Sequence, residues 1–98
     1  MIITSFNIRG FGSGPKCTAL KLLMGRIHPG IVLLQETMIY ASNACFYFLK
    51  IKPTWIVCAL DATRLSGGTL VAQDSSAACL KAFITCAGIL VEGKVLGF

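Results

Sequence analysis

Apolar residues in the first third of the chain follow three successive patterns. Met1 to Ile8 is rich in apolar residues and carries no charge, and the glycines and proline from Gly10 to Pro15 then interrupt regular structure. From Lys16 to Ile27, apolar residues recur with the spacing of one helical face. The run Ile31 to Leu34 is apolar without alternation, which is typical of a parallel strand covered on both faces. The pattern predicts a buried strand, a helix that Pro29 ends, and a second buried strand. The helical face consists of Leu20, Leu23, Met24 and Ile27.

A polar residue ends each of these two predicted strands. Asn7 lies at the end of the first and Glu36 follows the second. A strand-helix-strand crossover makes the strands parallel, so their carboxyl ends meet at the edge of the sheet where α/β folds bind ligands. A carboxylate near a core is unfavourable unless a cation or hydrogen bonds compensate. We therefore expect Asn7 and Glu36 to be neighbours and to form part of a divalent cation site.

The remainder of the chain predicts further strands. Thr37 to Lys50 fits a loop and a short helix equally well. Thr54 to Leu60 and Gly67 to Gln73 are β-rich and predict a hairpin with a longer loop. The last segment predicts one or two strands, Leu80 to Ala87 and Ile89 to Val95, around Gly88.

For several other polar and aromatic residues, an ordinary structural role is the favoured interpretation. Tyr40 and Tyr47 could stack on nucleic acid bases, but core packing is favoured for both. His28 should lie at the helix end, at the sheet edge opposite Asn7 and Glu36. Asp61 and Asp74 follow predicted strands, where Asp commonly forms turns or caps helices.

Three segments together resemble a known family. Ser5 to Gly12, Leu33 to Thr37, and Ala59 to Thr63 with Ser66 to Gly68 resemble the endonuclease/exonuclease/phosphatase family. The likeness is to the apurinic-type endonuclease domain of plant non-LTR (LINE-type) retrotransposons. It implies an α/β fold with a mixed sheet, in which a βαβ start and β-hairpins form the N-terminal part of a four-layer DNase I-like sandwich. It also implies a magnesium-dependent phosphodiesterase, in which Mn2+ could replace Mg2+, that nicks DNA.

The resemblance also implies roles for individual residues. The position of Glu36 is that of a direct metal ligand, and the position of Asn7 is that of a partner in the metal and phosphate network; both are expected catalytic residues. Ser66, Gly67 and Arg9 are expected substrate-side contacts, although a plain turn explains the glycines equally well. The family pattern continues with an Asp-x-Asn and a Ser-Asp-His segment, neither of which occurs here.

Composition agrees with an incomplete domain. The chain has 98 residues, of which 55% are hydrophobic and 13% charged. A small complete domain needs proportionally more polar surface than this. We expect residues 1–98 to be the N-terminal portion of the family's domain, and we expect negligible nicking by this portion alone.

Charge, cysteines and hydropathy restrict the partners and the compartment. The net charge of +5 favours polyanions such as DNA, although scattered lysines are commonly only a solvated surface. The five cysteines form no pattern typical of zinc binding or disulfides. The longest late apolar run, Ala82 to Val91, is about half of the roughly twenty residues that span a bilayer. We expect no membrane partner and an intracellular location, nuclear for a functional protein; the oligomeric state is left open.

Three functional interpretations remain. The first is the N-terminal part of a DNA-nicking, magnesium-dependent endonuclease. The second is a catalytically inactive retrotransposon remnant with at most weak nucleic-acid binding. The third, to which we give little weight, is an independent α/β binding module, which would have to protect an exposed sheet edge.

Overall fold

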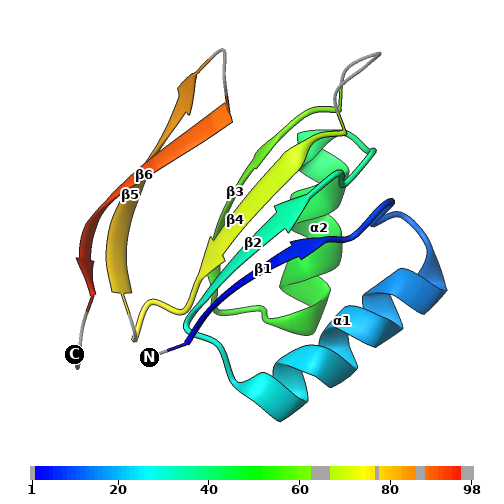
Figure 1. The fold of residues 1–98 in the computed structure, drawn as a ribbon, viewed down its shortest axis with the longest axis horizontal. Coiled ribbons are helices and arrows are strands. Elements are labelled where there is room, and N and C mark those ends of the chain that lie inside the picture. The colour runs from blue at the N-terminus through cyan, green and yellow to red at the C-terminus, as the bar shows by residue number, and fades with distance from the viewer. Residues whose placement is uncertain (1, 63–66, 77, 86–87, 96–98) are drawn as a thin grey trace.

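The computed structural model describes residues 2–62, 67–76, 78–85 and 88–95. Figure 1 shows a four-stranded sheet with both helices on one side and a separate two-stranded hairpin on the other. The elements, in chain order, are β1 (Ile3–Asn7), α1 (Gly14–Ile27), β2 (Ile31–Gln35), α2 (Ala41–Ile51), β3 (Ile56–Leu60), β4 (Thr69–Gln73), β5 (Ala78–Thr85) and β6 (Gly88–Val95).

The larger sheet is mixed and has the strand order β1-β2-β4-β3. β1 and β2 are parallel, so the predicted βαβ unit is confirmed. β4 pairs antiparallel with both β2 and β3, which confirms the predicted hairpin. β5 and β6 pair antiparallel with each other. The molecule is therefore an α/β structure whose first half is parallel and whose second half is built from hairpins.

Local sequence signals explain both ends of α1. The Ser13 hydroxyl caps the helix by accepting a hydrogen bond from the Lys16 amide at 3.4 Å, and Pro15 lies in the first turn. At the other end, His28 is the C-cap in the left-handed conformation, and its amide donates to the Met24 carbonyl at 2.9 Å. His28 is thus a helix-end residue, as predicted.

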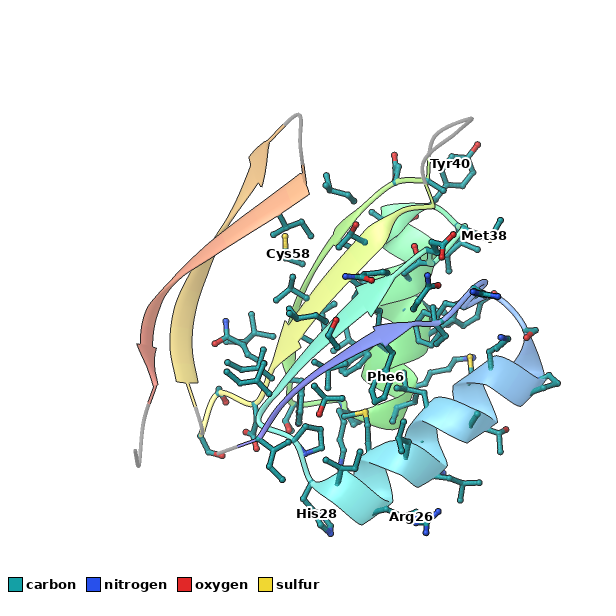
Figure 2. The ribbon with its side chains drawn as sticks, in the orientation of Figure 1. Phe6, Arg26, His28, Met38, Tyr40 and Cys58 are labelled. Carbon is teal, nitrogen blue, oxygen red and sulfur yellow. The ribbon has the colours of Figure 1, made fainter. Side chains whose placement is uncertain are left out.

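The core lies between the two helices and one face of the sheet. From α1 it takes Leu20 and Met24, and from α2 it takes Ala44 and Phe48. The Phe48 ring contacts Trp55 with a centroid distance of 5.7 Å. In Figure 2, Phe6 points to the helix side of the sheet and Cys58 points to the hairpin side. The remaining core residues are Phe11, Val32, Leu34, Ala59, Leu70 and Ala72.

The prediction that the first strand is buried is wrong. β1 is an edge strand of the four-stranded sheet, and its burial alternates along the strand. Helices cover only one of its faces, so Ile3 on the other face keeps 59% of its surface exposed. The apolar segment Met1 to Ile8 therefore contains an edge strand of which one face is covered, and not a strand buried on both faces.

The N-terminus of α2 is capped from a distant part of the chain. The amide of Ala41 donates a hydrogen bond of 2.6 Å to the Asp61 carboxylate, twenty residues away. Tyr40, the N-cap residue, forms no side-chain capping bond of its own. Asp61 therefore caps a helix, as predicted from its place after a strand, and it ties the β3–β4 loop to α2.

We expect Asp61→Ala to lower the free energy of unfolding by about 1 kcal/mol, the usual effect of losing a helix cap. Asp61→Asn keeps an oxygen that can accept from the Ala41 amide, so it should retain most of the stability. Urea unfolding followed by circular dichroism measures both variants. Equal losses in Asp61→Ala and Asp61→Asn would contradict the hydrogen-bond explanation.

Candidate functional site

The carboxyl ends of β1 and β2 meet at one edge of the sheet. Asn7 is in register with Gln35, and Glu36 is the next residue. Backbone hydrogen bonds continue past the strands: the Ile8 amide donates to the Gln35 carbonyl at 3.0 Å, and the Gly10 amide donates to the Glu36 carbonyl at 2.9 Å. The structure thus brings Asn7 and Glu36 to the same sheet edge, as the βαβ geometry predicts.

Three residues at this edge adopt a backbone conformation that is uncommon outside glycine. Arg9, Glu36 and Met38 have φ values of 48°, 54° and 60°. Such left-handed residues are a few per cent of non-glycine residues, and they occur preferentially at ligand sites and tight turns. The loops that carry Arg9 and Glu36 are joined, because the amide of Gly10 donates a hydrogen bond to the carbonyl of Glu36. The sequence contained no signal for this conformation.

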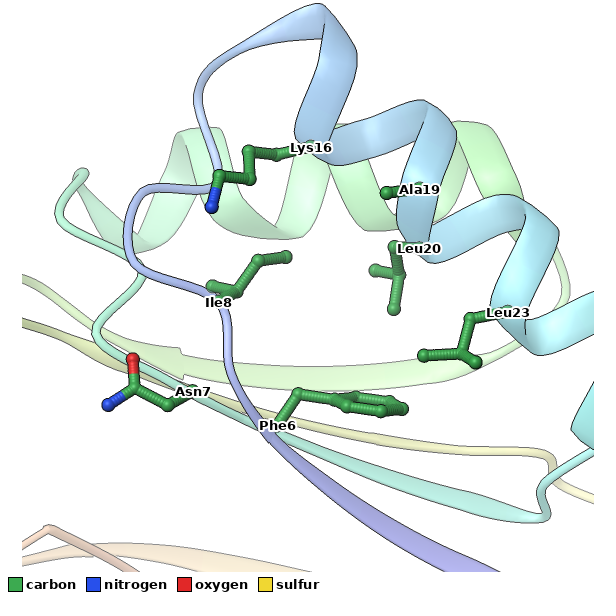
Figure 3. Close-up of a pocket in the computed structure, with 7 residues that line it drawn as sticks. All are labelled: Phe6, Asn7, Ile8, Lys16, Ala19, Leu20 and Leu23. Carbon is green, nitrogen blue, oxygen red and sulfur yellow. The ribbon is translucent and has the colours of Figure 1, made fainter.

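Both side chains of the predicted pair are exposed. Asn7 points away from α1, whereas its neighbours Phe6 and Ile8 point towards the helix (Figure 3). The expectation of a carboxylate near the core, in need of compensation, is therefore wrong for Glu36. An exposed carboxylate and an exposed amide oxygen are still available to a hard cation, since such oxygens are its preferred ligands.

Gly67 brings the loop before β4 against Glu36. A Cβ atom on Gly67 would lie 2.5 Å from the Cα of Glu36 and 2.8 Å from its Cβ. The carbonyl of Gly67 accepts hydrogen bonds from the Met38 amide and, at 3.3 Å, from the Thr37 hydroxyl. The structure therefore places Gly67 at the same edge as Asn7, Arg9 and Glu36, whereas Ser66 lies outside the described residues.

A hollow of about 200 Å³ opens between β1 and α1, beside Asn7. Figure 3 shows Leu20 and Leu23 of α1, Phe6 of β1 and Ile8 just after it on the walls, with Lys16 at one end. Ala19 completes the lining with Asn7. No pattern in the sequence predicted this hollow.

The opposite edge of the sheet holds His28, as predicted. In Figure 2, His28 lies at the far end of the molecule from Met38 and Tyr40. His28, Lys52 and Asp74 line a second, polar hollow of about 130 Å³. Hydrogen bonds from the Ser76 amide and hydroxyl, with a smaller effect of Lys52, lower the pKa of the Asp74 carboxyl. Asp74 thus forms a turn, as expected, and none of these groups is near Glu36.

The two tyrosines differ in their surroundings. Tyr40 is 68% exposed, so the prediction that it packs in the core is wrong. Tyr40 precedes α2 at the edge where β2 ends, and neither helix covers it. Tyr47 packs against the core, and its ring meets that of Phe11 edge to face with a centroid distance of 6.2 Å. The core-packing prediction therefore holds for Tyr47.

Three of the five cysteines belong to the described side chains. Cys17, Cys45 and Cys58 are free thiols, each partly buried. Burial, and to a smaller extent the neighbouring Cys58, raises the pKa of the Cys45 thiol. The Cys17 thiol donates a hydrogen bond to the Phe11 carbonyl at 3.4 Å, while Cys79 and Cys86 lie outside the described side chains.

Among the side chains that the structure describes, no three His, Cys, Asp or Glu residues gather as a metal-binding group. At the Asn7 edge the described residues supply two carboxylates, Glu36 after β2 and Asp61 after β3, and Asp61 accepts a hydrogen bond from the Ala41 amide. No helix in the described ranges has both the length and the hydropathy to cross a membrane. Neither a comparison with models of known protein families nor a search of curated proteins found a match to this chain.

Proposed function

We propose that this chain carries one wall of the active site of a magnesium-dependent phosphodiesterase that nicks DNA and derives from a retrotransposon. The observation that carries the proposal is the meeting of Asn7 and Glu36 at the carboxyl edge of two parallel strands. That edge is where α/β sheets bind their ligands. Glu36 is the proposed metal ligand, and Asn7 is its proposed partner.

The chemistry of the exposed oxygens supports this assignment. Mg2+ usually retains several water molecules and is held by only one or two carboxylates, with substrate phosphates as further ligands. Glu36 with the amide oxygen of Asn7 fits such a hard-cation site, and Mn2+ accepts the same ligands. When bound, the ion would neutralise charge on a phosphodiester and lower the pKa of a bound water.

The residues around Glu36 support a phosphate-bearing substrate. Arg9 is exposed and lies in the loop that is hydrogen-bonded to the Glu36 loop. A guanidinium forms paired hydrogen bonds to phosphate oxygens. The net charge of +5 would favour the approach of DNA over the whole surface. In this proposal, Arg9 contacts the DNA backbone next to the metal.

The finer fold is part of the same proposal. In a four-layer α/β-sandwich, two sheets pack face to face and helices cover the outer faces. The present sheet has both helices on one face and exposed isoleucines, Ile3 and Ile56, on the other. This arrangement supports the interpretation of the chain as the N-terminal part of a DNase I-like sandwich.

Metal binding at Glu36 tests the proposal directly. In a titration with Mn2+, we expect paramagnetic broadening of backbone amide NMR signals to centre on Asn7 and Glu36, and Glu36→Gln to abolish it. Asp74→Asn is the matched control, because it removes a partly exposed carboxylate at the opposite edge and should leave the broadening unchanged. Broadening that survives in Glu36→Gln would contradict the assignment.

The second candidate function is an inactive remnant that binds nucleic acid weakly. It is favoured by the engagement of Asp61, the other described carboxylate at this edge, in the cap of α2, where it accepts a hydrogen bond from the Ala41 amide. Salt-sensitive DNA binding without any Mn2+ effect at Glu36 would support the remnant, because phosphate contacts by lysine and arginine weaken steeply as salt rises. Plasmid nicking that Glu36→Gln abolishes would support the enzyme instead.

A further inference from the structure

Thr37 joins the loop after β2 to the loop before β4. Its side chain is fully buried, and its hydroxyl donates a hydrogen bond to the Gly67 carbonyl at 3.3 Å. Its amide donates to the Gly68 carbonyl, also at 3.3 Å, and the next amide, that of Met38, donates to the Gly67 carbonyl. We call Thr37, Gly67 and Gly68 the Glu36 clamp, because together they hold the backbone on the C-terminal side of Glu36.

The two glycines of the clamp leave no space for a side chain. A Cβ on Gly67 would meet the Cα, Cβ and Cγ of Glu36, at 2.5 to 2.8 Å. Gly68 has a φ of +78°, and a Cβ there would meet the Thr37 hydroxyl. The first contact includes backbone, so the Glu36 main chain would have to move. Any residue other than glycine at position 67 would therefore clash with Glu36 in its observed position.

We propose that Thr37, Gly67 and Gly68 are positioning residues, which set the left-handed backbone of Glu36 and so aim its carboxylate at the cation site. The proposal rests on the function proposed above. Gly67 was expected to contact the substrate. In this proposal it instead positions Glu36. Thr37, which the sequence analysis did not select, becomes part of the site although its buried hydroxyl is directed to the Gly67 carbonyl.

A single exposed ligand depends strongly on such a clamp. The Glu36 side chain is exposed, and the hydrogen bonds that hold this segment are made by backbone groups and by the Thr37 hydroxyl. A residue with φ of 54° lies in a sparsely populated conformation that persists only when its surroundings impose it. Groups that orient a metal ligand commonly change metal affinity about 10- to 100-fold when they are replaced.

The first test compares Gly67→Ala with Gly25→Ala in the 98-residue chain. Gly25 lies in α1, and a Cβ there meets nothing within 4 Å, so this variant controls for the added methyl group. We expect Gly67→Ala to change the one-bond Cα–Hα coupling of Glu36, which reports the sign of φ, and to weaken Mn2+ binding about 10- to 100-fold. Gly25→Ala should change neither. A wild-type coupling at Glu36 in Gly67→Ala would overturn the proposal.

The second test distinguishes the effect of the Thr37 hydroxyl from the effect of the volume of its side chain. Thr37→Val keeps the volume and the branched Cβ but removes the hydrogen bond to Gly67, whereas Thr37→Ser keeps that bond. We expect faster hydrogen exchange of the Thr37 and Met38 amides and weaker Mn2+ binding in Thr37→Val, with Thr37→Ser close to wild type on both. Equal behaviour of the two variants would overturn the role of the hydroxyl.

The two proposals fail in different ways. If the Glu36 coupling responds to Gly67→Ala but the wild-type chain shows no Mn2+ effect at Glu36, the metal site is wrong, and with it the positioning role, while the clamp contact itself is verified. If Mn2+ binds at Glu36 with equal affinity in wild type and in Gly67→Ala, the metal site is supported and the clamp is overturned.

Discussion

Phe48→Ala should lower the free energy of unfolding by about 3 to 5 kcal/mol, the usual loss when a buried phenylalanine is cut back to alanine. Phe48 has no exposed surface, belongs to the main core cluster and contacts the Trp55 ring. It joins α2 to the sheet, so the cavity would open at the contact that holds this helix. Folded proteins have only about 5 to 15 kcal/mol of stability, so this loss would be a large fraction of it.

The same helix supplies the control for this prediction. Phe46 is 57% exposed and contacts Tyr47 and the Lys50 ammonium at the surface. Phe46→Ala removes the same atoms without opening a core cavity, so we expect a loss below about 1 kcal/mol. Chemical denaturation followed by Trp55 fluorescence measures both variants. Similar losses for Phe46→Ala and Phe48→Ala would contradict the core described here.

Gly68→Ala is expected to have the second largest effect on stability, a loss of about 3 kcal/mol from two separate causes. The first is conformational, because a residue with a Cβ is disfavoured at the φ of +78° found there. The second is steric, because the new methyl group would meet the Thr37 hydroxyl, with the Ala62 nitrogen at 3.1 Å and the Leu60 oxygen at 3.2 Å.

Gly10→Ala separates these two causes. Gly10 has a φ of +100°, and a Cβ there meets nothing within 4 Å. It should therefore show the conformational loss alone, about 1 to 2 kcal/mol. Thermal and urea unfolding of the two variants gives the difference that belongs to the clash. A loss in Gly10→Ala as large as that in Gly68→Ala would contradict the close contact with Thr37.

Elements set by local periodicity could be predicted from the sequence. The helical spacing of apolar residues from Leu20 to Ile27 and the uninterrupted apolar run of β2 correspond to the observed helix and strand. The exposure of Ile3 could not be predicted in the same way, because it depends on which strand lies next to β1. Hydrophobicity alone does not distinguish an edge strand with one covered face from a central strand.

One part of the candidate site, the pair Asn7 and Glu36, could be predicted from the sequence, whereas the contact with Gly67 could not. A βαβ connection brings the ends of its two strands together, so the meeting of Asn7 and Glu36 follows from topology. The contact between Gly67 and Glu36 depends instead on β4 lying next to β2, a long-range pairing for which no local signal exists. The left-handed conformation of Glu36 is a further consequence of that pairing.

The position of β4 between β2 and β3 has a consequence for synthesis on the ribosome. β2 is complete once residue 35 has been translated, but the strand that pairs with its second edge ends only at Gln73. Until β4 is available, the second edge of β2 has no partner strand, and its backbone N–H and C=O groups stay unpaired. Unpaired edges on partly folded chains are sites of aggregation. Translation between residues 36 and 73 is therefore the period in which binding by a chaperone would most improve the yield of folded protein.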